Sequence, residues 1–193
     1  MSTRGLIGFR LDGIDKLTYN HSDSYPEWLG QHLSNQLIEL QATRSMTDLK
    51  NGVRGIRLVN EDDTPTEFDL ARLNHLSETE VDGICLNKGS NNNFYNLLRS
   101  AQGDLIACLE CRVMIDSSDF IYDSLFCEHA YIVNLDEETL EYYQGWQRQR
   151  HNKGRYSNEG PQDGYYPCAL RQEIPIKELE ILLDWQEIFK VAG

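Results

Sequence analysis

The residues best suited to chemistry form a polar cluster at positions 20–26, Asn-His-Ser-Asp-Ser-Tyr-Pro. Histidine is the side chain that ordinarily changes charge near neutral pH, so His21 could act as a general base with Asp23 orienting its ring, or the two side chains could bind a divalent ion. In a turn, however, such side chains often only satisfy backbone N–H groups, and that structural role is an equally strong alternative. The cluster is the first candidate site.

A nucleophile candidate stands near the start of the chain. Removal of Met1 would leave the Ser2 hydroxyl beside a free α-amine that can serve as its base. The order of residues that follows resembles the start of N-terminal nucleophile hydrolases, which implies a hydrolase. Those enzymes also need a defined oxyanion hole, and an inert processed terminus is the alternative interpretation. The catalytic candidates are Ser2, Arg4, Asn20, His21 and Asp23.

Cysteine and histidine could bind zinc if two distant segments converged. Cys108 and Cys111 lie one helical turn apart, and Cys127 and His129 would share one face of a strand. The first two stand in an apolar run, where free cysteine commonly serves as a small core residue. We therefore expect neither a metal nor another cofactor.

A basic stretch interrupts this otherwise acidic chain. Clustered cations could clamp a phosphate or a carboxylate despite the negative overall charge, whereas the alternative is a solvated loop. The anion-binding candidates are Arg148, Arg150, Lys153 and Arg155.

Charge and composition exclude several classes of protein. With 31 acidic and 18 basic residues the formal charge is −13, which disfavours general nucleic-acid binding and suits an acidic face that binds a basic groove on a partner. No apolar run approaches the ~20 residues that span a bilayer, so we expect no membrane insertion. The absence of a secretory signal pattern and the odd number of cysteines, five, favour the reducing cytoplasm.

The opening elements must position the polar cluster. Residues 6–11 and 16–20 are predicted strands joined by the Asp12-Gly13 turn. A helix is predicted from Pro26 to about residue 40, with Ser24 and Glu27 as its capping box. This helix should lie on the hairpin through its leucine stripe.

Further elements are predicted along the rest of the chain. A strand over residues 53–59 should contain a bulge at Gly55, and a second hairpin should join residues 127–135 to 140–143. The remaining elements are a short helix over 69–76, a strand near 84–86, a helix from Ser90 to Gly103, a helix up to Cys111, a loop over 147–164, a strand over 168–174 and a last helix from Pro175. We predict one α+β domain, residues 1–193, with a mixed, mainly antiparallel sheet of two hairpins packed by an early and a C-terminal helix.

Two stretches of the sequence resemble a family of uncharacterised phage and prophage proteins. They are the opening M-x-T-R-G with Y-N-H-x-D-S-Y-P at residues 19–26, and residues 120–143. The resemblance implies a phage-type origin and a setting in which takeover of a host or counter-defence is a natural role. We therefore expect an acidic interaction protein that binds a host or phage protein, with the hydrolase as the alternative. The sequence does not determine the oligomeric state.

Overall fold

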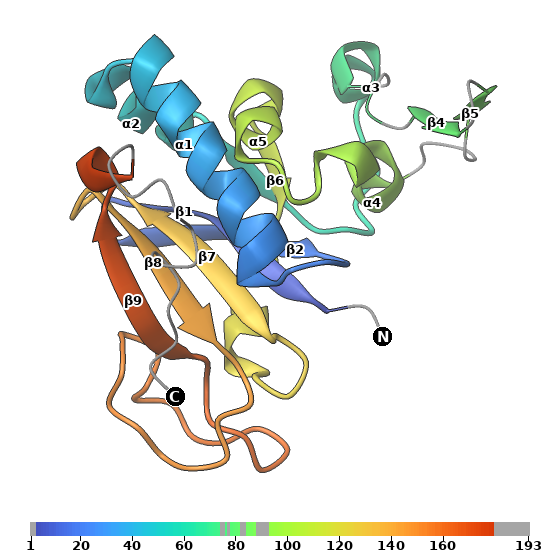
Figure 1. Cartoon of the computed structure of the whole chain (residues 1–193). Coiled ribbons are helices and arrows are strands. Elements are labelled where there is room, and N and C mark those ends of the chain that lie inside the picture. Colours follow the sequence, from blue (N-terminus) through green and yellow to red (C-terminus); the bar gives the residue numbers. More distant parts are fainter. Residues whose placement is uncertain (1–2, 74–75, 77, 82–83, 88–92, 180–193) are drawn as a thin grey trace.

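A five-stranded sheet forms the centre of the protein, seen here in a computed structural model that describes residues 3–73, 76, 78–81, 84–87 and 93–179 (Figure 1). The strand order is β2-β1-β7-β8-β9. All neighbours are antiparallel except β1 and β7, which are parallel. The mixed, mainly antiparallel sheet and the α+β class are as predicted. The strands are β1 (Gly5–Leu11), β2 (Ile14–Asn20), β7 (His129–Asn134), β8 (Thr139–Gln144) and β9 (Ala169–Pro175).

Both predicted hairpins are present. Asp12 and Gly13 adopt positive φ angles of 54° and 76°, which a two-residue turn between twisted strands requires. The turn aligns Leu11 with Ile14 and, at the far end, Gly5 with Asn20. The polar cluster therefore begins beside the first residues of β1.

Helices cover one face of the sheet, and loops cover the other. Figure 1 shows α1 lying across the sheet, with α2 and α5 beside it. Their bounds are Gln31–Thr43 for α1, Met46–Arg54 for α2 and Leu105–Cys111 for α5. The core under them includes Phe9, Leu33, Leu37, Tyr131 and Tyr142. The core on the loop face includes Leu6, Ile132, Tyr143, Tyr156 and Cys168.

Smaller elements flank this framework. β3 pairs with β6 in parallel, and β4 pairs with β5. A third core cluster lies around β6 and α4 and includes Phe94, Leu97 and Val113. The bounds are Arg57–Val59 for β3, Glu67–Leu73 for α3, Glu78–Val81 for β4, Ile84–Asn87 for β5, Phe94–Leu97 for α4, Arg99–Ala101 for η3, Val113–Ile115 for β6, Ser118–Tyr122 for η4 and Ile176–Glu178 for η5.

The strand predicted over residues 53–59 is wrong in its first half. Val53 lies in α2, and Gly55 caps the end of that helix instead of forming a bulge. The cause lies upstream, because the Ser45 hydroxyl accepts a hydrogen bond from the Asp48 N–H and starts a helix. The inward positions Leu49 and Val53 are one turn apart, so their burial stabilises it.

The predicted capping box at the first helix is also wrong. The chain enters α1 through a π-helical turn, η1 (Pro26–Gly30), whose cap residue is Tyr25 and whose cap makes no side-chain hydrogen bond. Ser24 is instead fully buried.

Three other predicted helices agree with the structure to different extents. The helix ending at Cys111 is confirmed, with Asp104 as its cap. The helix predicted from Ser90 begins at Phe94 after an Asn93 cap, and Ser90 lies outside the described residues. The helix predicted from Pro175 is described only as far as residue 179, and the remainder, positions 180–193, lies outside the described part.

Candidate functional site

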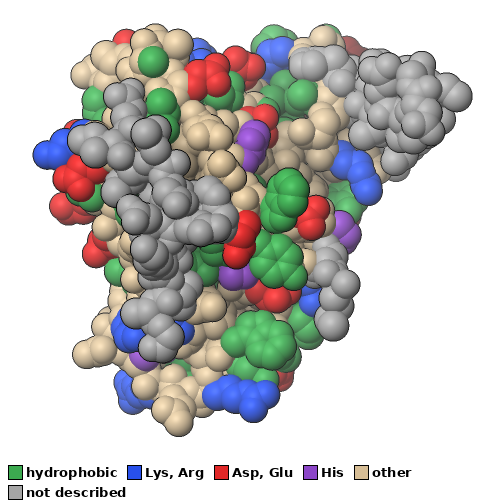
Figure 2. All heavy atoms as spheres, in the orientation of Figure 1, with side chains coloured by type: hydrophobic (Ala, Val, Ile, Leu, Met, Phe, Trp, Pro, Cys, Tyr) green, Lys and Arg blue, Asp and Glu red, His purple; other side chains and the backbone are tan. Residues whose placement is uncertain are grey.

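Four large aromatic side chains are exposed at one end of the main sheet, where β1 and β7 begin and β2 and β8 end. Only two other large hydrophobic side chains are exposed in the part of the chain that the structure describes, Ile14 and Phe68. Figure 2 shows hydrophobic side chains set between acidic and histidine side chains in the middle and lower part of the view. We call this surface the aromatic end; its residues are Tyr25, Trp28, Phe126 and Trp146, exposed by 43%, 71%, 39% and 57%.

A tight backbone turn holds Trp146 in place. Its N–H donates to the Ser124 carbonyl at 2.7 Å, and the preceding Gly145 N–H donates to the Glu128 carbonyl at 2.9 Å. A Cβ on Gly145 would lie 2.0 Å from the Cys127 carbonyl oxygen, so only glycine fits there. Trp146 itself has a φ of 62°. The indole is therefore presented by a fixed backbone.

Phe126 is held by the start of β1. The Arg4 guanidinium lies 4.5 Å from the centre of the Phe126 ring, within the range of a cation–π contact. Backbone hydrogen bonding links the same segments, since the Glu128 N–H donates to the Arg4 carbonyl at 3.1 Å. Arg4, a catalytic candidate from the sequence, thus supports an exposed aromatic ring.

A histidine–tyrosine pair lies behind Tyr25. His129 Nδ1 is 2.8 Å from the Tyr142 hydroxyl, and the Tyr25 ring centre is 5.9 Å from the His129 ring centre. Burial lowers the pKa of His129 to about 4, so its imidazole is neutral at pH 7. Tyr131 stacks on Tyr142, with 5.3 Å between ring centres. The buried Tyr131 and Tyr142 rings and the half-buried His129 ring form a floor under the exposed Tyr25.

The polar cluster holds the chain together beneath this surface. Asn20 Nδ2 donates to the Ser22 carbonyl at 2.6 Å and to Ser24 Oγ at 2.8 Å. The Ser24 N–H donates to the Thr3 carbonyl at 3.2 Å, and the Tyr131 hydroxyl donates to the Ser24 carbonyl at 3.0 Å. The donor group of Asn20 and all the polar atoms of Ser24 are therefore used in joining β1, β2 and β7.

The other two catalytic candidates of the cluster face outward. His21 is exposed, and its Nδ1 lies 3.3 Å from the Tyr19 hydroxyl. Asp23 is exposed too, with a φ of 55° that aspartate tolerates better than most residues. The Ser24–Thr3 hydrogen bond places the start of the described chain beside the cluster. Ser2 lies outside the described residues, so the hydrolase stays a prediction.

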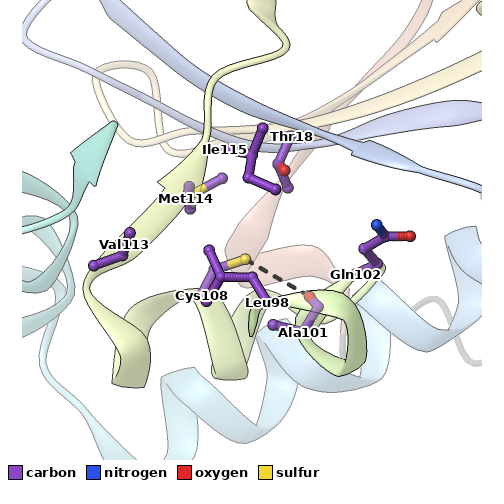
Figure 3. A pocket seen from close by; sticks show the side chains of 8 residues that line it. All are labelled: Thr18, Leu98, Ala101, Gln102, Cys108, Val113, Met114 and Ile115. Atoms are coloured by element: carbon purple, nitrogen blue, oxygen red, sulfur yellow. Dashed lines mark hydrogen bonds between the residues drawn. The ribbon is translucent and has the colours of Figure 1, made fainter. Parts of the chain in front are cut away.

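The zinc candidates do not converge. Cys108, Cys111 and Cys127 belong to three different core clusters. Within the described ranges, no three His, Cys, Asp or Glu side chains are grouped to hold a metal ion. Burial raises the pKa of Cys111 to about 11, so its thiol is protonated at neutral pH. Cys108 lines a cavity of about 10 Å³, room for a single water at most (Figure 3).

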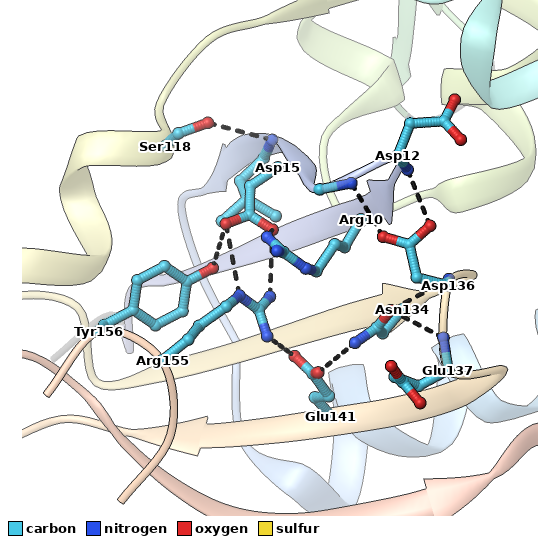
Figure 4. A network of polar contacts seen from close by, with 12 residues as sticks. Arg10, Asp12, Asp15, Ser118, Asn134, Asp136, Glu137, Glu141, Arg155 and Tyr156 are labelled. Atoms are coloured by element: carbon cyan, nitrogen blue, oxygen red, sulfur yellow. Dashed lines mark hydrogen bonds and ion pairs between the residues drawn. The ribbon is translucent and has the colours of Figure 1, made fainter. Parts of the chain in front are cut away.

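The basic stretch is divided by the fold. Arg155 does not face solvent as an anion clamp, because it donates to Asp15 Oδ1 at 3.1 Å and also pairs with Glu141 (Figure 4). Asp15 accepts further hydrogen bonds from Arg10 at 3.0 Å and from the Tyr156 hydroxyl at 2.8 Å. Two guanidinium groups thus balance two carboxylates, and we call this group the ion network.

The ion network fastens the long loop, residues 145–168, to the sheet. Glu141 is 2% exposed, and its other oxygen accepts from Asn134 Nδ2 at 2.7 Å. Arg148, Arg150 and Lys153 remain exposed. Arg148 also donates to the Tyr165 hydroxyl at 3.3 Å. Three cations of the predicted anion site therefore stay at the surface, whereas the fourth, Arg155, pairs with Asp15 and Glu141.

Sequence reasoning missed the aromatic end and the His129–Tyr142 pair. Exposure of an aromatic ring cannot be read from its identity, because most aromatic residues are buried. The pair could have been found, since the β7–β8 turn places His129 opposite Gln144 and therefore diagonal to Tyr142.

The arrangement defines an α+β protein with a preformed aromatic surface at the end of a mixed sheet. Comparison with protein-family models, curated proteins and solved structures found no match. Among the helices that the structure describes, none has the length and apolarity needed to cross a membrane.

Proposed function

We propose that this protein acts by binding another protein through its aromatic end. The observation that carries the proposal is that, of the six large hydrophobic side chains exposed in the described part of the chain, four lie at this one surface. Aromatic residues are enriched at protein–protein interfaces, and Trp and Tyr are the residues that most often dominate binding energy.

The rigidity of the surface supports the same function. The Gly145–Trp146 turn and the contact between half-buried His129 and buried Tyr142 restrict the rings before any partner arrives. A preorganised surface loses less conformational entropy on binding, so more of the contact energy appears as affinity.

Charge indicates the chemistry of the partner. Asp23 and Glu27 are exposed beside the aromatic rings, and the chain as a whole carries −13. A partner surface with an apolar pocket flanked by Lys or Arg is complementary to this pattern, and long-range attraction would speed the encounter. The phage-type resemblance supports a host or phage protein, bound during takeover of the cell or against its defences, as the partner class.

A matched pair of variants tests the proposal. Trp28→Ala removes an aromatic side chain that is 71% exposed at the aromatic end, and Phe68→Ala removes one that is equally exposed on α3. The immobilised wild-type protein and both variants would be incubated with lysate of the cell that expresses it, and any retained protein purified for measurement of Kd. We expect Trp28→Ala to weaken binding about tenfold or more, because an anchoring Trp contributes ~2 kcal/mol or more, and Phe68→Ala to bind like the wild type.

Two outcomes would overturn the proposal. One is a purified partner whose Kd is the same for wild type and Trp28→Ala. The other is an equal loss in both variants, which would show that binding follows general surface apolarity. Melting temperatures of all three proteins serve as the control for folding.

A further inference from the structure

The long loop carries a positive charge that the aromatic end does not use. No Asp or Glu occurs between Glu141 and Glu159, although the chain contains 31 acidic residues. Arg148, Arg150 and Lys153 lie in this interval and are exposed. Among the residues that the structure describes, none of these three cations has an ion-pair partner. We call them the exposed cations; they can bind an anion without first breaking an ion pair.

Backbone hydrogen bonds hold the segment that carries the exposed cations. The Tyr166 N–H donates to the Gln147 carbonyl at 2.7 Å, and the Leu170 N–H donates to the Lys153 carbonyl at 3.3 Å. These bonds attach residues 147 and 153 to the chain leading into β9. Because five residues span at most about 18 Å, the three charges lie within the length of a short segment of a linear polyanion.

Aromatic side chains accompany the exposed cations. Trp146, two positions before Arg148, is 57% exposed. The Arg148 guanidinium lies 5.7 Å from the centre of the Tyr165 ring, which is half-buried. Proteins that bind single-stranded nucleic acids combine cations along the backbone with aromatic rings on which the bases stack. An acidic protein would use the cations but would not need an exposed indole beside them.

The overall charge of −13 acts at longer range than these contacts. At physiological ionic strength the Debye length is ~8 Å, so carboxylates farther away are largely screened. Glu159 and Asp163, the acidic residues of the long loop, lie outside the segment that holds the exposed cations. Arginine also donates two parallel hydrogen bonds to a phosphate group, which favours a phosphate ligand for Arg148 and Arg150.

We propose that the exposed cations and Trp146 bind a single-stranded nucleic acid. Arg148, Arg150 and Lys153 contact successive phosphates, and an unpaired base stacks on the Trp146 indole. The site shares Trp146 with the aromatic end but does not depend on the protein partner proposed above. The small number of cations implies weak binding that is independent of base sequence.

Fluorescence anisotropy with a labelled oligouridylate of about 12 nucleotides tests the site. Three phosphate contacts on a single strand predict a slope of about −2 for the logarithm of the binding constant against the logarithm of salt concentration. The affinity should therefore fall about twentyfold between 50 mM and 200 mM salt. No saturable binding at 50 mM salt, or binding that does not change with salt, would overturn the proposal.

A matched pair of lysine variants locates the phosphate contacts. Lys153→Gln should weaken oligouridylate binding about fivefold at 50 mM salt and make the slope about 0.7 less negative. Lys177→Gln removes an exposed lysine of η5, beyond the far end of β9, and should change neither quantity. Equal effects of the two variants would show that binding follows the general charge of the protein, and would contradict the assignment.

An aromatic pair of variants tests the stacking. Trp146→Ala should weaken oligouridylate binding at least fivefold but leave binding of inorganic polyphosphate, which has no bases, unchanged. Phe68→Ala, which removes an exposed ring of α3, should affect neither ligand. Equal losses in both variants would exclude a stacking role for Trp146. Tighter binding of poly-glutamate than of oligouridylate by the wild type would assign the exposed cations to an acidic protein and overturn the proposal. Melting temperatures of all variants serve as the control for folding.

Discussion

At the aromatic end of the main sheet, the buried polar atoms of Asn20 and Ser24 are hydrogen-bonded and the exposed side chains include four aromatic rings. At the opposite end, which we call the turn end because the β1–β2 and β7–β8 turns lie there, the surface side chains include the ion pairs Asp12–Arg54 and Lys50–Glu138. The same five strands run between the two ends. The difference shows that one sheet can support two ends of different chemistry, each determined by the loops at that end.

The largest effect is expected at the ion network, which attaches the long loop to the sheet. Arg155→Ala would leave Asp15 and the buried Glu141 without their shared cation, so it should lower the free energy of unfolding by about 3–5 kcal/mol. Urea denaturation measures this. The control is Arg150→Ala, an exposed arginine of the same loop, which should stay within ~0.5 kcal/mol of wild type. Similar values for both variants would show that the ion network does not fasten the loop.

A pH experiment tests the half-buried His129 at the aromatic end. The pKa of His129 is lowered by burial from 6.5 to about 4, so its protonation favours the unfolded chain. Above pH 6.5 His129 is neutral in both states and the shift does not reduce the free energy of unfolding. As the pH falls from 6.5 towards 4, the unfolded chain binds a proton that the folded protein does not, so the free energy of unfolding decreases. Between pH 7 and pH 5 the wild type should lose about 2 kcal/mol more than His129→Gln, in which nothing titrates at this position. Parallel curves for the two proteins would contradict the burial of this imidazole.

A smaller effect distinguishes the buried Ser24 of the polar cluster from the exposed His21. Ser24→Ala removes the buried acceptor of the Asn20 amide and should cost about 1 kcal/mol, through a lost interior hydrogen bond instead of a lost helix cap. His21→Ala, at an exposed position, should stay within ~0.5 kcal/mol. Thermal unfolding of both variants is the measurement, and a larger loss for His21→Ala would reverse the roles assigned to the two residues.

The smallest effect is expected at the turn end, where ion pairs are exposed. Asp12 pairs with Arg54 at 2.8 Å, and the hydrogen bond from Arg54 lowers the pKa of Asp12. Asp12→Asn keeps a residue that tolerates positive φ, so it isolates the charge. The melting temperature should fall slightly at low salt and match wild type at 1 M salt, where exposed charges are screened. A deficit that persists at high salt would mean that packing, not charge, is lost.

Local patterns predicted the parts of the fold that local chemistry determines. The Asp12-Gly13 turn and the β7–β8 hairpin were readable because each depends on a few adjacent residues. Ser24 was misread because serine suits both a helix cap and a buried hydrogen bond, and only the neighbouring strands decide between them. The sequence likewise offered no sign that Arg155 would lie inside the protein.

Long-range pairing accounts for what could not be predicted. Nothing near β1 indicates that its second neighbour is β7, because Arg4 and Glu128 are 124 positions apart. The aromatic end depends on that pairing, since it brings Phe126 beside Arg4 and His129 beside Tyr25. The candidate surface is therefore a product of the tertiary fold, whereas the polar cluster, which is local, was found from the sequence.

The parallel pairing of β1 with β7 also has a consequence for synthesis of the chain. β1 ends at Leu11, but the residues that complete its second edge, His129–Asn134, leave the ribosome about 120 residues later. At translation rates of roughly 5–20 residues per second, that edge stays unpaired for about 6–25 s. Over this interval the nascent hairpin exposes backbone hydrogen-bonding groups that can pair with another chain, so a holding chaperone would act most effectively there.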